Sequence, residues 1–262
     1  MPEKVPDPSR FLITPRKLVQ TFAERYDVDM ARLELPETAI LVPVVPLFMK
    51  LTRVLKGEPM TAWKWKSPLF HEFALGEGKK GVLACCPIGA PNVAIAIEEL
   101  AAFGVRFLYF FGFAGGIGEK VSPGTLVLPH YAHVGEGTTR YYKDGPLSFA
   151  DGELLEAVKC ALETETGETL TVCPVWTTDA LYREGRTEVE RFARMGVCGV
   201  DMEVSAVFSV AKTLSVRAVA LLWISDLLSL EDWKPHFHQK ALRDAIDRYA
   251  RAFVVFLQKG ER

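Results

Sequence analysis

The stretch Gly199–Asp226 constrains the fold more than any other part of the chain. Apolar and acidic side chains alternate over residues 200–203, a pattern typical of a strand or of its end. Apolar side chains then follow helical spacing, and residues 217–225 form an apolar run with a single charge. Such a run is typical of a central strand that is covered on both faces, as in an α/β sheet. Asp226 follows at the point where we expect this strand to end.

Apolar runs and helical patterns alternate along the rest of the sequence, without an internal repeat. We expect strands at 38–45, 70–75, 81–86, 106–111, 125–129 and 169–178, and helices at 14–35, 47–57, 91–103, 152–166, 187–195 and in a last segment ending near 259. This alternation predicts a single α/β domain whose mostly parallel or mixed central sheet has helices on both faces. Residues 1–37 are expected to form an N-terminal arm and helix, and residues 38–262 the domain.

Composition excludes several classes of partner. The 31 basic and 33 acidic residues give a formal net charge of −2, so no electrostatic surface for nucleic acid or membrane is expected. No apolar run has the length of a membrane span, and the N-terminus lacks the apolar core of a signal peptide. The five cysteines, an odd number, do not suggest a disulfide framework. A reduced, cytoplasmic setting is therefore expected.

Three familiar kinds of site are disfavoured. The glycine-rich run at residues 112–118 follows an expected strand, but its spacing matches neither a dinucleotide fingerprint nor a Walker loop. We interpret it as a tight turn or a close approach of backbone to ligand. The histidines lack the spacing of zinc ligands, so no metal is expected, and no Gly-x-Ser-x-Gly elbow is present. Residues 130–150 are interpreted as a long loop or flap.

The acids of the central stretch are the first candidates for chemistry. A carboxylate at a strand end most often caps a helix or forms a turn, and this alternative stays open for Asp201 and Asp226. Glu203 is harder to explain in this way, because it lies between apolar residues at the entry to an apolar helix. A buried carboxylate needs a partner, and a ligand with hydroxyl donors would provide one. Ligands of α/β sheets bind outside strand ends, so we expect these acids to meet at one edge.

Four ordered segments resemble the nucleoside phosphorylase and nucleosidase superfamily. The first is the central stretch, in which Val200-Asp201-Met202-Glu203 precedes a helix and a strand ending in Ile224-Ser225-Asp226. The others are residues 88–105, 111–129 and 176–184. The resemblance covers roughly residues 38–258. It implies a phosphorylase-like fold, a small-molecule nucleoside as substrate, a homo-oligomer (dimer or hexamer) and no cofactor, with phosphate as a possible co-substrate.

The same resemblance implies roles for individual residues. Glu203 would bind the 2′ and 3′ hydroxyls of the ribose, Met202 would pack under the sugar, and Asp226 would donate a proton to the departing base. A general acid of this kind assists the departure of a leaving group. Further substrate contacts are expected from Val200, Asp201, the glycine-rich residues Phe113, Ala114 and Gly115, and the base-side residues Leu181, Tyr182, Arg183 and Arg186.

The chain departs from the family at the side of the nucleophile. Apolar residues stand at the positions where the phosphorylases bind phosphate, namely Val44, Phe48, Phe110 and Phe113. A dianion needs fixed positive charge or converging N–H donors, and these side chains supply neither. The glutamate with which the nucleosidases activate water is also absent. Pentosyl transfer to phosphate is the leading hypothesis; the alternatives are a hydrolytic nucleosidase and a non-catalytic nucleoside-binding protein. The identity of the base stays open.

Overall fold

The computed structural model describes residues 11–66, 69–228 and 233–259. The expected arm at residues 1–10 lies outside this part of the chain. The helices are α1 (Pro15–Tyr26), α2 (Val45–Leu55), α3 (Ala90–Ala102), α4 (Gly152–Thr166), α5 (Arg186–Arg194), α6 (Val204–Thr213) and α7 (Lys240–Lys259). The strands are β1 (Thr38–Val42), β2 (Glu58–Pro59), β3 (Phe70–Gly76), β4 (Lys79–Cys85), β5 (Phe107–Ile117), β6 (Leu126–Gly135), β7 (Leu147–Phe149), β8 (Thr171–Thr178), β9 (Gly199–Asp201), β10 (Arg217–Leu228) and β11 (Trp233–Pro235).

The strands of the described residues form one mixed sheet, in the order β11-β10-β6-β8-β9-β5-β1-β4-β3-β2, with β7 beside β6. Strands β1, β4, β5 and β10 run in one direction, and β6, β8 and β9 run in the other. An additional pairing joins β10 to β5, so that β5, β10, β6, β8 and β9 close a ring. The prediction of a mixed α/β sheet is confirmed.

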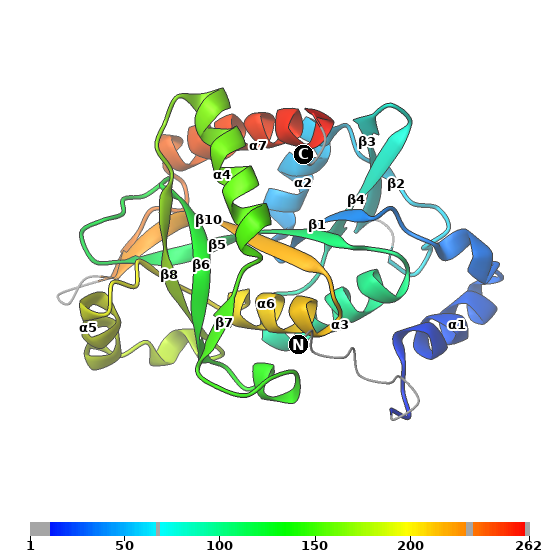
Figure 1. The fold of residues 1–262 in the computed structure, drawn as a ribbon, viewed down its shortest axis with the longest axis horizontal. Coiled ribbons are helices and arrows are strands. Elements are labelled where there is room, and N and C mark those ends of the chain that lie inside the picture. Colours follow the sequence, from blue (N-terminus) through cyan, green and yellow to red (C-terminus); the bar gives the residue numbers. More distant parts are fainter. Residues whose placement is uncertain (1–10, 67–68, 229–232, 260–262) are drawn as a thin grey trace.

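Helices cover the sheet on both sides (Figure 1). Side chains alternate across a strand, so neighbouring residues of β5 enter different cores. Phe110 packs into the core that includes residues of α3 and α6, whereas Phe111 packs into the core that includes residues of α2, α4 and α7. Both side chains are fully buried. The two apolar layers fix the position of β5, the strand on which the candidate site is built.

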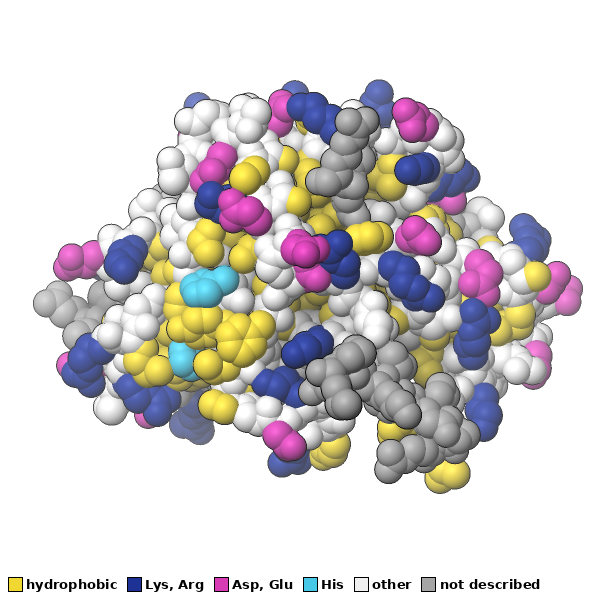
Figure 2. Space-filling model, viewed as in Figure 1, with side chains coloured by type: hydrophobic (Ala, Val, Ile, Leu, Met, Phe, Trp, Pro, Cys, Tyr) yellow, Lys and Arg dark blue, Asp and Glu magenta, His cyan; other side chains and the backbone are white. Residues whose placement is uncertain are grey.

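Charged groups fix the start of α4 against the sheet. Asp151 accepts a hydrogen bond from the backbone N–H of Leu154 at 2.8 Å, which satisfies one of the unpaired donors of the first turn. The same carboxylate pairs with both Nε and Nη2 of Arg217, the first residue of β10. Asp151 is therefore the N-cap of α4, and the cap also ties the helix to the central strand. Charges of both signs intermingle on the face shown in Figure 2.

The glycine-rich run is part of a strand and not a turn. β5 continues through Gly112, Gly115 and Gly116 to residue 117, because β9 and β10 pair with it on either side. Strong pairing partners override the low strand propensity of glycine. The expected long loop at residues 130–150 is also wrong in part, since β6 extends to residue 135 and β7 pairs with it.

Strand β10 is longer than predicted. It continues past Asp226 to Leu228, with a register shift at Ser225. Asp226 therefore lies inside a strand and pairs with Gly115 of β5 on one side and with Pro235 of β11 on the other. Residues 229–232, between these strands, lie outside the described part of the chain. No helix that the structure describes has the length and apolar character needed to cross a bilayer.

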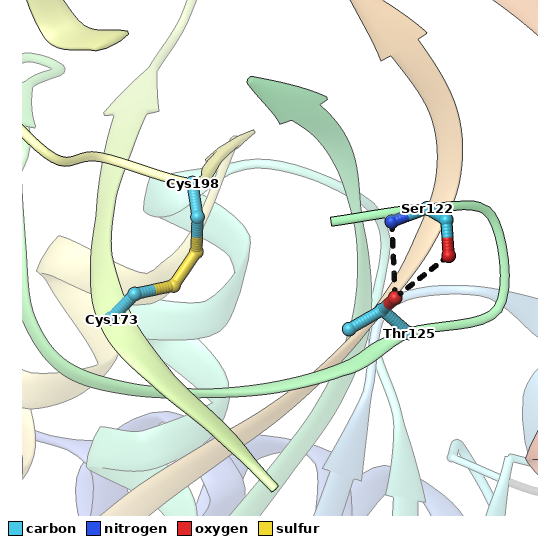
Figure 3. Close-up of a disulfide and its surroundings, with 4 residues drawn as sticks. All are labelled: Ser122, Thr125, Cys173 and Cys198. Carbon is cyan, nitrogen blue, oxygen red and sulfur yellow. Dashed lines mark hydrogen bonds between the residues drawn. A yellow bond between two sulfur atoms is a disulfide. The ribbon is translucent and has the colours of Figure 1, made fainter. Parts of the chain in front are cut away.

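A disulfide joins Cys173 of β8 to Cys198, the residue before β9 (Figure 3). The parallel pairing of the two strands brings the Cα atoms to 6.2 Å, within the range that a disulfide spans. The expectation that the cysteines are reduced is therefore wrong for this pair. Spacing in the sequence does not reveal it, because the two cysteines are 25 positions apart and the chain between them leaves the sheet and returns to the neighbouring strand. Nearby, Ser122 donates its backbone N–H to the hydroxyl of Thr125.

Candidate active site

The candidate site is organised around Gly115 of β5. Val200 of β9 and Asp226 of β10 are both in register with this glycine, one on each side. A Cβ atom at Gly115 would lie 3.2 Å from Oδ2 of Asp226 and 3.3 Å from Cγ1 of Val200. The side chains of both neighbouring strands therefore fold over the space that glycine leaves open. β9 runs antiparallel to β5 and β10 runs parallel to it, so the two strands approach Gly115 from opposite directions.

Substitution of Gly115 by alanine is expected to lower the free energy of unfolding by about 1–3 kcal/mol, the usual cost of overpacking. The new methyl group would collide with Cδ1 of Leu228 and approach Asp226. Urea denaturation would measure the change. Gly152→Ala is the matched control, because no atom lies within 4 Å of a Cβ there and the residue begins α4. An equal loss in both variants would contradict the close packing at Gly115.

Glu203 lies at the start of α6 and is almost completely buried, with 4% of its surface exposed. Its Oε1 accepts a hydrogen bond of 2.7 Å from the backbone N–H of Gly89. Gly89 has a φ of +109°, which favours glycine, and it precedes the first turn of α3. The carboxylate thus lies where the beginnings of α3 and α6 meet. The partial positive charge of a helix N-terminus stabilises an anion at such a place.

Asp201 is also buried, but the structure engages both of its oxygens within the protein. Oδ1 accepts a hydrogen bond from the hydroxyl of Thr177 at 2.8 Å, and Oδ2 accepts from the backbone N–H groups of Glu203 and Val204. Asp201 therefore caps α6 and holds the backbone of Glu203 in place. Thr177 in turn accepts from the backbone N–H of Ser205, so β8 supports the same turn.

The two neighbouring acids influence each other's charge. Burial, together with the negative charge of Asp201, raises the pKa of Glu203 above its ordinary value. Burial also raises the pKa of Asp201, and the charge of Glu136 adds to this effect, while hydrogen bonds from Val204, Glu203 and Thr177 act in the opposite direction. A ligand that donates hydroxyl hydrogens to Glu203 would favour its ionised form.

Asp226 is half-buried and accepts two hydrogen bonds. The hydroxyl of Ser225 donates to Oδ1 at 2.7 Å, and the indole Nε1–H of Trp233 donates to Oδ2 at 2.7 Å. Trp233 belongs to β11, which pairs with β10 at this point. These two donors orient the carboxylate toward the space above Gly115.

Glu184 is a residue of this site that the sequence analysis missed. It precedes Gly185, the N-cap of α5, and its side chain is half-buried. Burial raises the pKa of Glu184 to about 7, and the charges of Asp226 and Asp201 contribute to the increase. Glu184 is therefore within electrostatic range of both acids. In the sequence it is one glutamate in a charged segment, without a pattern that separates it from surface residues.

The other base-side residues of the same segment face solvent. Leu181 is 53% exposed and Tyr182 is 93% exposed, and both arginines, Arg183 and Arg186, are also exposed. Leu181, Tyr182 and Arg183 form a short 3₁₀ turn that follows β8. Glu184 is thus half-buried, while these four side chains lie on the outer surface of the segment.

The residues expected around the sugar and the nucleophile are mostly apolar and buried. Val200 and Ala114 are buried, and Met202 and Phe113 are half-buried. At the positions where relatives are expected to bind phosphate, Phe110 is fully buried in the core, Phe48 packs against His71, and Val44 is half-buried. The nearby cation Lys66 pairs with Glu99 of α3 at 2.7 Å. This side of the site is therefore apolar.

Among the described residues, no group of three or more His, Cys, Asp or Glu side chains could hold a metal ion. The acids of the site are carboxylates, which can accept hydrogen bonds from hydroxyl groups and exchange protons. Asp201 supports Glu203 through the backbone.

Several relatives match the chain in sequence. A DeoD-type purine nucleoside phosphorylase of Clostridium perfringens is 31% identical over 155 residues, which are 58% of this chain and 66% of that protein. The chain thus spans slightly less than two thirds of that relative. A DeoD-type purine nucleoside phosphorylase of Bacillus cereus is 28% identical over 191 residues, which are 72% of this chain and 81% of that protein.

Solved structures match the fold. The uridine phosphorylase of Vibrio fischeri ES114, complexed with 6-hydroxy-1-naphthoic acid, superposes with a TM-score of 0.69 at 18% identity, covering 88% of this chain and 94% of that one. A second structure of that protein gives a TM-score of 0.70 at 19% identity, covering 88% and 93% of the two chains. The family model of the phosphorylase superfamily matches residues 39–257. Because this match includes the whole sheet core and every acid of the site, the resemblance predicted from four segments is confirmed, and the chain belongs to the phosphorylase superfamily.

Proposed function

We propose that the protein cleaves the N-glycosidic bond of a nucleoside. The observation that carries this proposal is that β10 with Asp226 and β9, which leads into Glu203, flank the same glycine of β5, with Glu203 buried at the meeting point of two helices. A carboxylate held in this way is suited to a ligand with neighbouring hydroxyl groups, as in a ribose. Asp226 lies on β10, which flanks β5 on the side opposite to β9.

The chemistry follows from the charges that develop during bond cleavage. The sugar becomes an oxocarbenium-like cation and the base leaves with an electron pair. Glu203 would bind the 2′ and 3′ hydroxyls and stabilise the cationic sugar, while Met202 packs against the ring. Asp226 would assist protonation of the departing base. Asp201 has a positioning role, because it holds the backbone of Glu203 through a hydrogen bond of 2.8 Å.

Phosphate is the acceptor that the relatives favour, since the matched proteins in Clostridium perfringens and Bacillus cereus are named purine nucleoside phosphorylases. One observation favours water as a second candidate. The positions expected to bind phosphate carry Val44, Phe48, Phe110 and Phe113, and the two phenylalanines 48 and 110 are buried in the cores. An apolar wall provides no charge for a dianion.

The products distinguish the two acceptors. The purified protein would be incubated with a panel of purine and pyrimidine nucleosides, with and without phosphate, and the products separated by chromatography. Phosphorolysis predicts ribose 1-phosphate and a rate that depends on phosphate. Equal release of free ribose in phosphate-free buffer would reject phosphorolysis and support hydrolysis. Calorimetric binding of a nucleoside without any turnover would overturn the proposed activity and favour a binding protein.

A further inference from the structure

We propose that Trp233 and Phe237 form the wall against which the nucleobase packs, and that Trp233 also positions Asp226. The inference rests on the proposed function, because it names the residues that would hold the base of the same substrate. Trp233 acts as a positioning residue through its indole N–H and as a binding residue through its ring. Three observations carry the inference: the register of β11, the hydrogen bond to Asp226, and the exposure of both rings.

The register of β11 places Trp233 beside the candidate site. Trp233 lies opposite Leu228 in the antiparallel pair of β10 and β11, and Pro235 lies opposite the acid at position 226. Side chains two positions apart on a strand share a face, so Trp233 and Asp226 are diagonal neighbours on one face of the sheet. Leu228 belongs to the same face, and its Cδ1 would collide with a Cβ atom at Gly115. Trp233 is therefore on the side of the sheet where this glycine leaves space open.

Backbone hydrogen bonds hold the segment that carries both rings. The N–H of His236 donates to the carbonyl of Ser225 at 3.2 Å, which continues the attachment of β11 to β10. The N–H of Gln239 donates to the carbonyl of His236 at 3.0 Å and closes the turn in which Phe237 lies. Helix α7 follows directly. The place of both rings beside the end of β10 thus follows from the fold.

The hydrogen bond of Trp233 fixes the orientation of Asp226. Its Nε1–H donates to Oδ2 of Asp226 at 2.7 Å, and the hydroxyl of Ser225 donates to Oδ1 at the same distance. Oδ2 is also the oxygen that would lie 3.2 Å from a Cβ atom at Gly115. An indole N–H can only donate, so the carboxyl group cannot turn away from the glycine without losing this bond.

The two rings form an exposed aromatic surface next to this carboxyl group. Trp233 is 54% exposed and Phe237 is 49% exposed. Their ring centroids are 6.1 Å apart and their planes are inclined at 51°, as is typical of an aromatic pair. Small-molecule sites combine such apolar and aromatic walls with a few well-placed polar groups. The pair of rings and the carboxyl group of Asp226 provide both parts.

A nucleobase matches this combination, because it has a flat aromatic face and polar atoms along its edge. Every base has a π-face, so an aromatic wall binds purines and pyrimidines alike. The edge of the base is then within reach of Asp226, whose orientation Trp233 maintains. Binding of the base and positioning of the acid therefore depend on the same side chain.

The fluorescence of Trp233 tests the contact without any need for turnover. The other four tryptophans are half-buried or buried, so acrylamide should quench the wild type more than Trp233→Phe. Saturating adenosine, uridine, adenine or uracil should reduce this difference about twofold or more, because the base covers the ring. A base or nucleoside that binds in calorimetry but leaves the difference unchanged would overturn the inference.

Steady-state kinetics separate the two roles of Trp233. Trp233→Phe keeps a ring but lacks the N–H, so kcat should fall about tenfold while KM changes little. Trp233→Ala also removes the wall, and KM should rise about tenfold or more. Phe237→Leu should raise KM and leave kcat unchanged. Trp65→Phe is the matched control, because it removes a buried Nε1–H that has no hydrogen-bond partner among the described residues. Thermal unfolding would check that each variant folds.

Two results would overturn the inference while leaving the proposed function intact: nucleoside cleavage with the same kcat in Trp233→Phe and Trp65→Phe, or an unchanged KM in both Trp233→Ala and Phe237→Leu. If no nucleoside is cleaved, the proposed function fails separately, and calorimetry with adenine and uracil tests the wall by itself. Binding that is weakened about tenfold in Trp233→Ala would then support the inference. Equal binding by both proteins, or no binding of either base, would overturn it.

Discussion

Replacement of Asp226 by asparagine is expected to lower kcat for nucleoside cleavage by about 10²–10⁴-fold, the usual contribution of a general acid. The amide can still accept from Trp233 through its oxygen, but it cannot pass a proton to the base. Substrate affinity should change little, since the side chain keeps its shape and its place above Gly115. Steady-state kinetics with separate values of kcat and KM would measure the effect.

The asparagine variant makes a second, independent readout possible. Removal of the charge at position 226 takes away one cause of the raised pKa of Glu184, so this pKa should be lower in the variant, which NMR titration of the carboxyl groups would measure. Asp247→Asn is the matched control, because it makes the same chemical change on α7 at a residue that pairs with Lys50. Full activity of Asp226→Asn would show that the base leaves without help from this residue.

Replacement of Glu203 by glutamine should lower kcat/KM by about 10²–10³-fold. A hydrogen bond to a charged group contributes roughly 1.5–3 kcal/mol, and the carboxylate would serve two ribose hydroxyls. The fold should survive, because the amide oxygen can still accept from the backbone N–H of Gly89. Thermal unfolding would check this point, and kinetics would measure the loss of activity.

Substrate analogues separate a direct contact of Glu203 from a structural effect. Removal of the 2′ or 3′ hydroxyl from the substrate should lower kcat/KM of the wild type more than that of Glu203→Gln. The variant already lacks the carboxylate that would accept hydrogen bonds from these hydroxyls. Glu156→Gln, on the exposed side of α4, is a control that keeps the site unchanged. An equal loss with each analogue in both proteins would indicate that Glu203 does not contact the ribose.

The alternation of strands and helices was predictable because each element carries its own hydrophobic pattern. The central stretch is the clearest case: residues 217–225 are apolar enough to be covered on both faces, and they form most of β10. Helix α4 and its cap at Asp151 follow from local chemistry in the same way. Such features depend only on residues a few positions away, so they can be predicted from the sequence alone.

The features that were missed depend on residues far apart in the sequence. The glycines of β5 are extended because β9 and β10 pair with them, and no local propensity indicates this. The direction of β9 depends on the return of the chain after α5, which also brings Cys198 to Cys173. Glu184 becomes an acid of the site only because apolar residues of α5 attach the segment to the sheet. These relations appear only in the folded chain.

The ring formed by β5, β10, β6, β8 and β9 has a consequence for adaptation to different ligands. Each of these strands has hydrogen-bonded neighbours on both sides. None can shift along its axis without breaking the backbone hydrogen bonds to both neighbours. The ring of strands that carries the acids is therefore rigid. Differences in ligand preference between relatives must then arise in the segments that connect these strands. One such segment is the linker from β8 to β9, which carries Glu184 and α5. Exchange of this linker between relatives should transfer ligand preference while leaving the ring of strands unaltered.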